Sequence, residues 1–304
     1  MDEIAPATPP AAAPAPAPPD ERPRFDGQAS APRTGTESWA PWTGFAALFA
    51  ALILAALGGL IVDIPAVALG VRITSSHIPP GIVNLDTFVQ DIGFVVTSVF
   101  FAQIGGRAVS ASQFGLRPTR LWRAVGLIVL TVIVFLVFSG VWSLLVESPK
   151  EELLKQLGTE KNAALLIASA LLTCVVAPVC EEFLFRGYIF AALRNWHGTL
   201  PAALLTGILF GGVHATSAPA VDLIPLGFLG FALCLLYQRT GSLYPGIVVH
   251  TLNNCFAFAE LEEWSAWEIP LLMAASLAVL GGLAFALTRT GVLGAEPVHV
   301  GGHG

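Results

Sequence analysis

The sequence predicts an all-α polytopic membrane protein with about eight transmembrane helices. Of its 304 residues 55% are hydrophobic and only 12% are charged, and the mean hydropathy is +0.73. Soluble domains carry about 25% charged residues. The apolar residues also form runs long enough to cross a bilayer. The net charge of −6 comes without a basic patch, so we expect no nucleic-acid partner.

The elements follow in order along the chain. Residues 1–41 are rich in Pro and Ala and carry a few charges, which predicts a disordered, partly polyproline II cytoplasmic tail rather than a signal peptide. A transmembrane domain is expected over residues 42–292 and a flexible tail over 293–304. The predicted spans are about 43–70, 86–106, 121–146, 162–185, 200–217, 220–238, 242–260 and 268–290.

The basic residues predict the orientation of these spans. Eight helices place both termini on one side of the membrane. Most arginines fall on that side, whereas Arg72, Lys150, Lys155 and Lys161 fall on the other. The positive-inside rule therefore predicts that both termini are cytoplasmic. The arginines on the side of the termini are Arg22, Arg24, Arg33, Arg107, Arg117, Arg120, Arg123, Arg186, Arg194, Arg239 and Arg289.

Two further groups of polar residues have simple interpretations. The four cysteines lie in apolar runs without paired spacing, which favours small buried side chains over a disulfide frame or a zinc site. They are Cys174, Cys180, Cys234 and Cys255. Asp63 stands late in the first span before Pro65, where we interpret it as a residue at the outer interface.

The first motif lies in the fourth span, where Glu181, Glu182 and Arg186 interrupt an apolar run. An ionisable group at the centre of a membrane helix costs about 2.5–3.5 kcal/mol on insertion scales, so such groups usually face the protein interior and serve a function. Glu182 and Arg186 are four residues apart, the spacing of a helical ion pair. Successive helical residues point about 100° apart, which leaves Glu181 as the free carboxylate.

The second motif is Phe210-Gly-Gly-Val-His214 in the fifth span. Both Glu181 and His214 stand about 25 Å from the turn near Gly198, at 1.5 Å per residue, so antiparallel neighbours would bring them to one depth. Gly211 and Gly212 would let the helix backbones approach closely. A histidine at this depth is predicted to be a site residue.

The third motif, His250-Thr-Leu-Asn-Asn254, lies in the seventh span. His250 and Asn254 are four residues apart and share a helix face, about 14–20 Å from the inner end. We therefore predict that both belong to the site. Asn253 points elsewhere and is interpreted as a packing residue.

Together these residues favour the activation of water. The sequence contains no G-x-S-x-G and no H-E-x-x-H motif, and Ser217 and Ser242 lie at helix ends rather than at the depth of the three motifs. A carboxylate such as Glu181 can act as a general base. Imidazoles and an amide can donate hydrogen bonds to the oxyanion that forms when water attacks a peptide carbonyl.

The three motifs resemble those of the intramembrane proteases of the CAAX prenyl endopeptidase and bacteriocin-processing type, also called the CPBP, Abi or self-immunity family. Its motifs E-E-x-x-x-R, F-x-x-x-H and H-x-x-x-N stand here in order within residues 160–260. The resemblance implies an eight-helix fold with a chamber inside the membrane. It implies that Glu181 activates the water with help from His214, and that His250 and Asn254 form the oxyanion hole. Glu182 and Arg186 would hold the fourth helix in place.

The resemblance leaves the cofactor open. One possibility is a metal-free glutamate protease, which requires no cofactor. It accounts for Asn254 better than a zinc site does, because amides are poor zinc ligands. The alternative is a metalloendopeptidase with zinc or another divalent metal bound by Glu181, His214 and His250.

The resemblance also bounds the function without choosing a substrate. It implies a multi-pass enzyme of the bacterial cytoplasmic membrane that contacts lipid and cleaves a membrane-associated or lipidated protein or peptide. CAAX processing, bacteriocin maturation and cleavage of a C-terminal sorting signal are all compatible with it. A non-catalytic self-immunity or scaffold protein is the alternative, although no motif residue is lost. A proton or ion transporter is disfavoured because the polar residues cluster at one depth and no internal repeat is visible.

Overall fold

A computed structural model describes residues 39–74, 78–104, 108–146 and 162–289. The expected tails therefore lie outside the described residues, except for residues 39–41. The helices are α1 (Pro41–Ala68), α2 (Pro80–Ala102), η2 (Ala111–Phe114), α3 (Leu121–Leu145), α5 (Ala163–Leu171), η3 (Leu172–Val176), α6 (Ala177–Glu182), η4 (Phe183–Phe190), α7 (Ala191–His197), α8 (Thr199–Val213), η5 (His214–Thr216), η6 (Ala220–Asp222), α9 (Leu223–Thr240), α10 (Tyr244–Leu261) and α11 (Glu268–Arg289).

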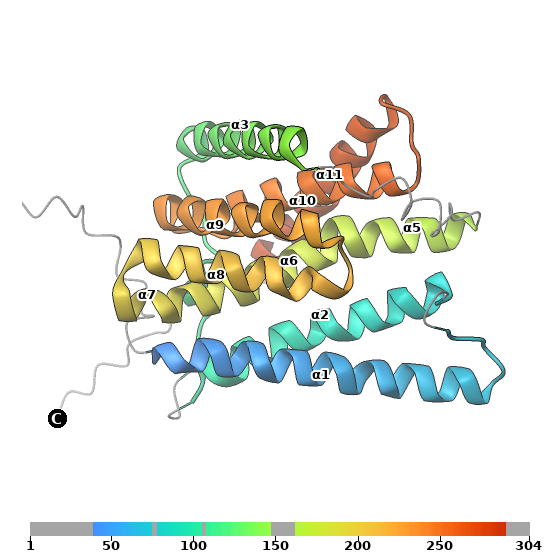
Figure 1. The fold of residues 1–304 in the computed structure, drawn as a ribbon. Helices are drawn as coiled ribbons and strands as arrows, with labels where there is room; N and C mark the ends of the chain where they lie inside the picture. The colour runs from blue at the N-terminus through green and yellow to red at the C-terminus, as the bar shows by residue number, and fades with distance from the viewer. Residues whose placement is uncertain (1–38, 75–77, 105–107, 147–161, 290–304) are drawn as a thin grey trace, which may run out of the picture. The chain divides into compact units, whose positions relative to one another are not determined.

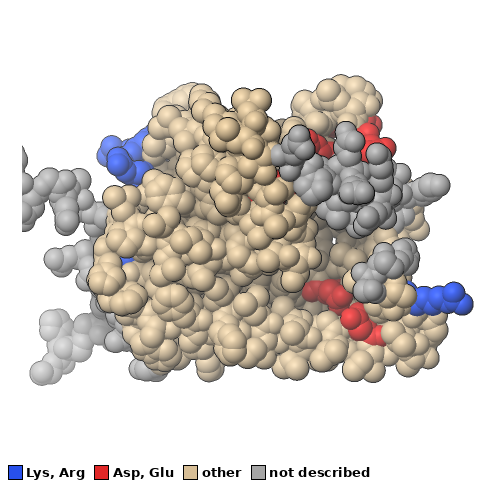
Figure 2. Space-filling model, in the orientation of Figure 1, with Lys and Arg blue, Asp and Glu red and all other residues tan. Residues whose placement is uncertain are grey.

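The all-α membrane fold is confirmed. Seven described helices are long and apolar enough to cross a membrane, and they correspond to seven of the eight predicted spans. The remaining predicted span, 242–260, corresponds to α10. This helix carries the polar third motif and packs against α3, α6, α9 and α11. Uncharged residues cover most of the surface seen in Figure 2, as a lipid-facing surface requires. The cytoplasmic placement of both termini stays a prediction.

The segment from Ala163 to His197 forms the centre of the bundle. It runs as one stack of helical turns through α5, η3, α6, η4 and α7, and η3 and η4 are π-helical. Its second half packs against α1, α2, α8 and α9, and α6 contacts α10 (Figure 1). Every residue from Glu181 to Leu193 is buried. The site motif therefore lies on the most enclosed element of the fold.

The start of the helical region differs from the predicted boundary. Trp39, expected in the tail, is only 5% exposed. Its ring lies 5.2 Å from that of Phe114 and 4.8 Å from that of Tyr188. Pro41 begins α1, where a missing backbone N–H is not needed. The apolar indole ring draws the end of the predicted tail into the core, which the Pro-rich composition does not reveal.

The helix ends follow from local chemistry. Asn162 caps α5 because its side-chain oxygen accepts hydrogen bonds from the backbone N–H groups of Ala164 and Leu165, at 3.0 and 3.3 Å. Gly198, with φ of 80°, makes the sharp turn from α7 to α8. The predicted break near this glycine is thus confirmed.

The close contact of α8 and α9 depends on Gly211 and not on Gly212. A Cβ atom on Gly211 would lie 2.5 Å from the carbonyl oxygen of Leu223 and 3.0 Å from the nitrogen of Gly227, whereas a Cβ on Gly212 would meet nothing within 4 Å. The prediction that both glycines serve close approach was therefore wrong for Gly212. That residue is exposed, because only one of two successive helical positions can face the neighbouring helix.

This difference gives a test of the helix packing. Gly211→Ala should destabilise the protein by about 1–3 kcal/mol, because the new methyl group collides with backbone that cannot move aside easily. Gly212→Ala is the matched control and should be neutral or slightly stabilising, since alanine is the better helix former. Thermal unfolding of both variants in the same detergent measures the effect. Equal stability of the two variants would contradict the observed packing.

Candidate active site

Glu181 and Glu182 lie at the end of α6, between the two π-helical segments. Glu181 is 9% exposed, and Glu182 and Arg186 are fully buried. Proteins frequently place π-helical turns at functional sites, because the inserted residue re-aims the side chains around it. Glu182 pairs with Arg186 and Glu181 faces His214, whereas His250 lies between the two carboxylates.

Glu182 holds a buried network across three helices. Its Oε1 accepts a hydrogen bond from Arg186 Nη1 at 2.7 Å, so the predicted ion pair is present. The same oxygen lies 2.9 Å from His250 Nδ1 on α10. Arg186 Nη2 also donates to the carbonyl oxygen of Gly230 on α9, at 3.0 Å. The guanidinium group lies over the ring of Phe210, 4.5 Å from its centroid, which adds a cation–π contact.

The contact between Glu182 and His250 was missed by the sequence analysis, which gave Glu182 only the partner Arg186. The spacing of two residues on one helix predicts their contact, but a contact between α6 and α10 depends on how the helices pack. No pattern in the sequence indicates it. The result is that Glu182 orients a site histidine as well as its own helix.

Both predicted histidines face Glu181. His214 Nε2 lies 4.0 Å and His250 Nε2 lies 3.6 Å from Glu181 Oε2. His214 begins η5 directly after α8, and His250 lies on α10, so three segments meet here. Glu181 Oε2 is buried and has no hydrogen-bond partner in the described part of the chain. The structure therefore brings Glu181, His214 and His250 together at one point.

The other imidazole nitrogens fix the two rings. His214 Nδ1 lies 2.7 Å from the carbonyl oxygen of Phe210, and His250 Nδ1 contacts the Glu182 carboxylate. Both partners are acceptors, so each Nδ1 carries the hydrogen and each Nε2 is directed toward Glu181. The separations to Glu181 are too long for direct hydrogen bonds. A water molecule between these groups could donate to the carboxylate and to an imidazole nitrogen.

Asn254 is anchored next to this cluster and not in direct contact with Glu181. Its Nδ2 donates to the carbonyl oxygen of Thr173 on η3, at 3.0 Å. Its Oδ1 accepts a hydrogen bond from Asn253 at 3.3 Å, in keeping with a packing role for that residue. An amide nitrogen has two hydrogens, so one remains for a substrate oxygen. The contribution of Asn254 to an oxyanion hole stays a prediction.

Asp91 on α2 is a further buried acid, which none of the three sequence motifs includes although it lies in the predicted span 86–106. It is 1% exposed, and neither of its carboxylate oxygens has a hydrogen-bond partner among the described residues. It lies near enough to Glu181 for the two like charges to repel each other. The sequence feature that indicates Asp91 is its position as an ionisable residue inside an apolar run.

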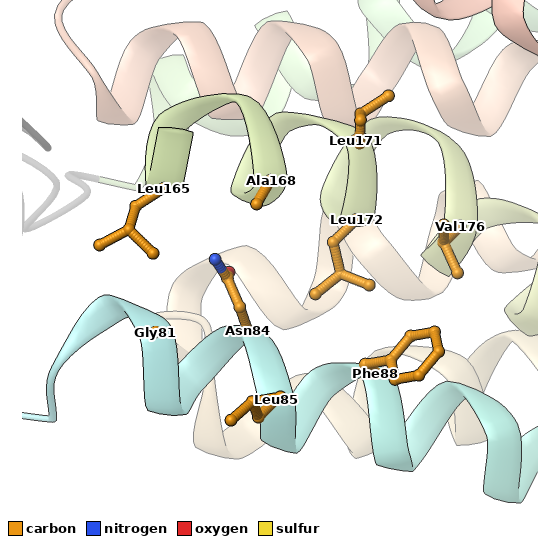
Figure 3. Close-up of a pocket in the computed structure, with 9 residues that line it drawn as sticks. All are labelled: Gly81, Asn84, Leu85, Phe88, Leu165, Ala168, Leu171, Leu172 and Val176. Carbon is orange, nitrogen blue, oxygen red and sulfur yellow. The ribbon is translucent and has the colours of Figure 1, made fainter. Parts of the chain in front are cut away.

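An apolar cleft lies on the α5 side of the site, between α2 and α5 (Figure 3). Its volume is about 330 Å³, and Figure 3 shows Leu165, Leu172 and Val176 facing Asn84 and Phe88 of α2. The full lining is Gly81, Asn84, Leu85, Phe88, Leu165, Ala168, Leu171, Leu172 and Val176. Val176 directly precedes α6, so the cleft ends about one turn before the two glutamates.

The three candidate zinc ligands are spaced more widely than a bound zinc ion requires. A tetrahedral zinc ion with bonds of about 2.0–2.1 Å holds its ligand atoms about 3.3 Å apart. Glu181 Oε2 lies 3.6 and 4.0 Å from the two imidazole nitrogens. The described residues contain no group of three His, Cys, Asp or Glu side chains placed to hold one metal ion.

Comparisons with known proteins identify the segment that carries the motifs. Residues 163–256 match the model of the type II CAAX prenyl endopeptidase Rce1-like family. The match runs from the start of α5 to α10 and contains Glu181, His214, His250 and Asn254. It confirms the resemblance that the three motifs indicated.

The chain is also similar to two bacterial proteins over part of its length. It is 33% identical to "Putative membrane peptidase YdiL" of Bacillus subtilis over 86 residues, which are 28% of this chain and 34% of YdiL. It is 30% identical to UPF0177 protein YxdF of Lactococcus lactis over 82 residues, 27% of this chain and 44% of YxdF. The chain thus matches less than half the length of either relative. No solved structure matches it.

The Glu182 network predicts different behaviour for single and double variants. Glu182→Leu and Arg186→Leu should each lower stability by about 3–5 kcal/mol, because each leaves a buried charge without its partner. The double variant should recover part of that stability, since an apolar pair can replace a buried ion pair at little cost while His250 Nδ1 still loses its acceptor. Thermal unfolding in detergent measures all three. A double variant as unstable as the sum of both single changes would contradict this account.

Proposed function

We propose that the protein is an intramembrane endopeptidase that hydrolyses a peptide bond near the membrane-associated end of a protein or peptide substrate. The observation that carries this proposal is the buried Glu181 Oε2, which faces the Nε2 atoms of two histidines from two other segments. The match of residues 163–256 to the Rce1-like family and the similarity to YdiL support it.

The proposed reaction begins with a water molecule held between Glu181 and the two imidazoles. Glu181 removes a proton from this water as the oxygen attacks the carbonyl carbon of the scissile bond. His214 positions the water, because its ring is fixed by the carbonyl oxygen of Phe210. The groups are held in place before substrate binds, so little reorganisation is needed during the reaction.

The oxyanion that forms in this step is stabilised by His250 and Asn254. A protonated His250 would donate from Nε2 while Glu182 holds its Nδ1 hydrogen, as the 2.9 Å contact allows. The free Asn254 N–H supplies the second donor. A peptide with an apolar segment suits the cleft between α2 and α5, whose lining is mostly hydrocarbon. We assign the substrate only to this class, membrane-associated proteins and peptides.

The direct test compares the wild-type chain with Glu181→Gln. Each is expressed in a bacterial strain that lacks the gene, and the protein termini in membrane extracts are determined by mass spectrometry. We expect a set of new termini with the wild type that Glu181→Gln abolishes, because glutamine cannot accept the proton from water. Glu263→Gln makes the same change at an exposed position in the loop after α10 and should behave as wild type. Identical termini for all three proteins would favour a non-catalytic self-immunity or scaffold function.

The role of Asn254 can be tested with a peptide that spans the cleavage site found in this way. Asn254→Ala should lower kcat by about 10²–10³-fold, the usual loss when one oxyanion donor is removed. Asn253→Ala is the neighbouring control and should lower kcat far less. Both variants must be compared by thermal unfolding, because Asn254 also ties α10 to η3 through Thr173. Near-normal kcat in a folded Asn254→Ala protein would remove this residue from the oxyanion hole.

A further inference from the structure

Asp91 is a buried acid that the proposed mechanism does not use. It is 1% exposed in the middle of α2, and both of its carboxylate oxygens lack a hydrogen-bond partner among the described residues. A polar group in this state costs free energy, and an isolated buried charge costs far more. Acids inside a membrane segment usually face a functional cavity. Asp91 therefore needs a functional explanation.

The packing of α2 places Asp91 beside the site. Two contacts show that α2 runs parallel to the central segment: Asn84 meets Ser169, with 3.0 Å between their side-chain oxygens, and further along Phe94 meets Phe185, with 6.5 Å between ring centroids. Asp91 precedes Phe94 by one turn, and Glu181 precedes Phe185 by one turn.

The electrostatic contacts agree with this placement. Asp91 lies within electrostatic range of Glu181 and of Cys180, the residue before Glu181 on α6. Glu181 Oε2 is itself buried and without a hydrogen-bond partner in the described residues. Unsatisfied carboxyl oxygens from α2 and α6 thus lie near each other, which marks a place for a polar ligand.

Two neighbouring carboxyl groups in a site of low dielectric do not both carry a charge, so one of them holds a proton. Glu181 faces the two imidazoles of His214 and His250, which can carry a compensating positive charge. Asp91 has no cation beside it in the described part of the chain. If Glu181 is to act as the base, the shared proton must reside on Asp91.

We propose that Asp91 is a catalytic residue, the general acid that protonates the leaving amide nitrogen of the substrate. This inference rests on the proposed function. The oxygen of water bonds to the carbonyl carbon and its proton passes to Glu181. The C–N bond then breaks as the Asp91 proton passes to the nitrogen, which releases an amine and a carboxylic acid. A proton transfer from Glu181 to Asp91 restores the starting state, so the net reaction is hydrolysis.

The test uses two substrates that differ only in the leaving group. One is the peptide that spans the mapped cleavage site, and the other is its thioester analogue, in which sulfur replaces the scissile nitrogen. An amine cannot leave without a proton, whereas a thiol leaves as its anion near neutral pH. Asp91→Asn should therefore lower kcat for the peptide by about 10²-fold or more and leave kcat for the thioester within about threefold.

The ratio of the peptide rate to the thioester rate distinguishes a loss of chemistry from a loss of folded protein. Both rates are measured on the same preparation, so a lower fraction of folded enzyme reduces them equally. Asp91→Ser gives a second neutral side chain and should show the same shift in the ratio, whereas Asp91→Glu keeps an acid and should restore part of the peptide rate. Asp86→Asn, the same change on the same helix, should leave both rates unchanged.

Other outcomes separate this inference from the proposed function. An equal loss on both substrates, or no loss on either, would overturn the role of Asp91 while leaving a protease dependent on Glu181 in place. If the wild type cleaves neither substrate in a manner that Glu181→Gln abolishes, the proposed function itself fails.

Discussion

The architecture of the site depends on one buried carboxylate oxygen. Glu182 Oε1 accepts hydrogen bonds from Arg186 on the same central segment and from His250 on α10. Arg186 also donates a hydrogen bond to the backbone carbonyl of Gly230 on α9. Because Glu182, Arg186 and His250 are buried, each member of this network would be costly without the others. The network therefore fixes how α6, α9 and α10 stand relative to one another. The position of His250 Nε2 beside Glu181 follows from it.

The two adjacent glutamates have different roles, one structural and one proposed to be chemical, and both lie against the imidazole ring of His250. Glu182 holds the Nδ1 side of His250 at 2.9 Å, and Glu181 lies 3.6 Å from its Nε2 side. One ring thus couples the fully buried carboxylate of Glu182 to the carboxylate proposed to activate water. Removing Glu182 removes an orienting contact and not only an ion pair. A variant that restores stability with apolar residues would still lack the acceptor for His250.

Local sequence patterns predicted most of the membrane spans and some of the contacts in the site. Apolar runs revealed the spans, and the spacing of Glu182 and Arg186 revealed their ion pair, because both depend on residues near in sequence. The meeting of Glu181 with His214 followed from equal distances to one turn. The contact of Glu182 with His250, the exposed side of Gly212 and the burial of Trp39 depend on how distant segments pack. A single sequence carries no signal for such contacts.

Charge balance explains how a third acid fits into a site inside the membrane. Glu182 and Arg186 cancel each other in a direct contact of 2.7 Å. In the proposed mechanism a protonated imidazole balances Glu181, which leaves no cation for Asp91 among the described residues and requires it to be neutral. A neutral acid beside a charged base is the arrangement that amide hydrolysis needs, since one group takes a proton and the other gives one. α2 lies outside the family segment 163–256, so the chemistry proposed here joins a family motif to a helix that the motif does not include.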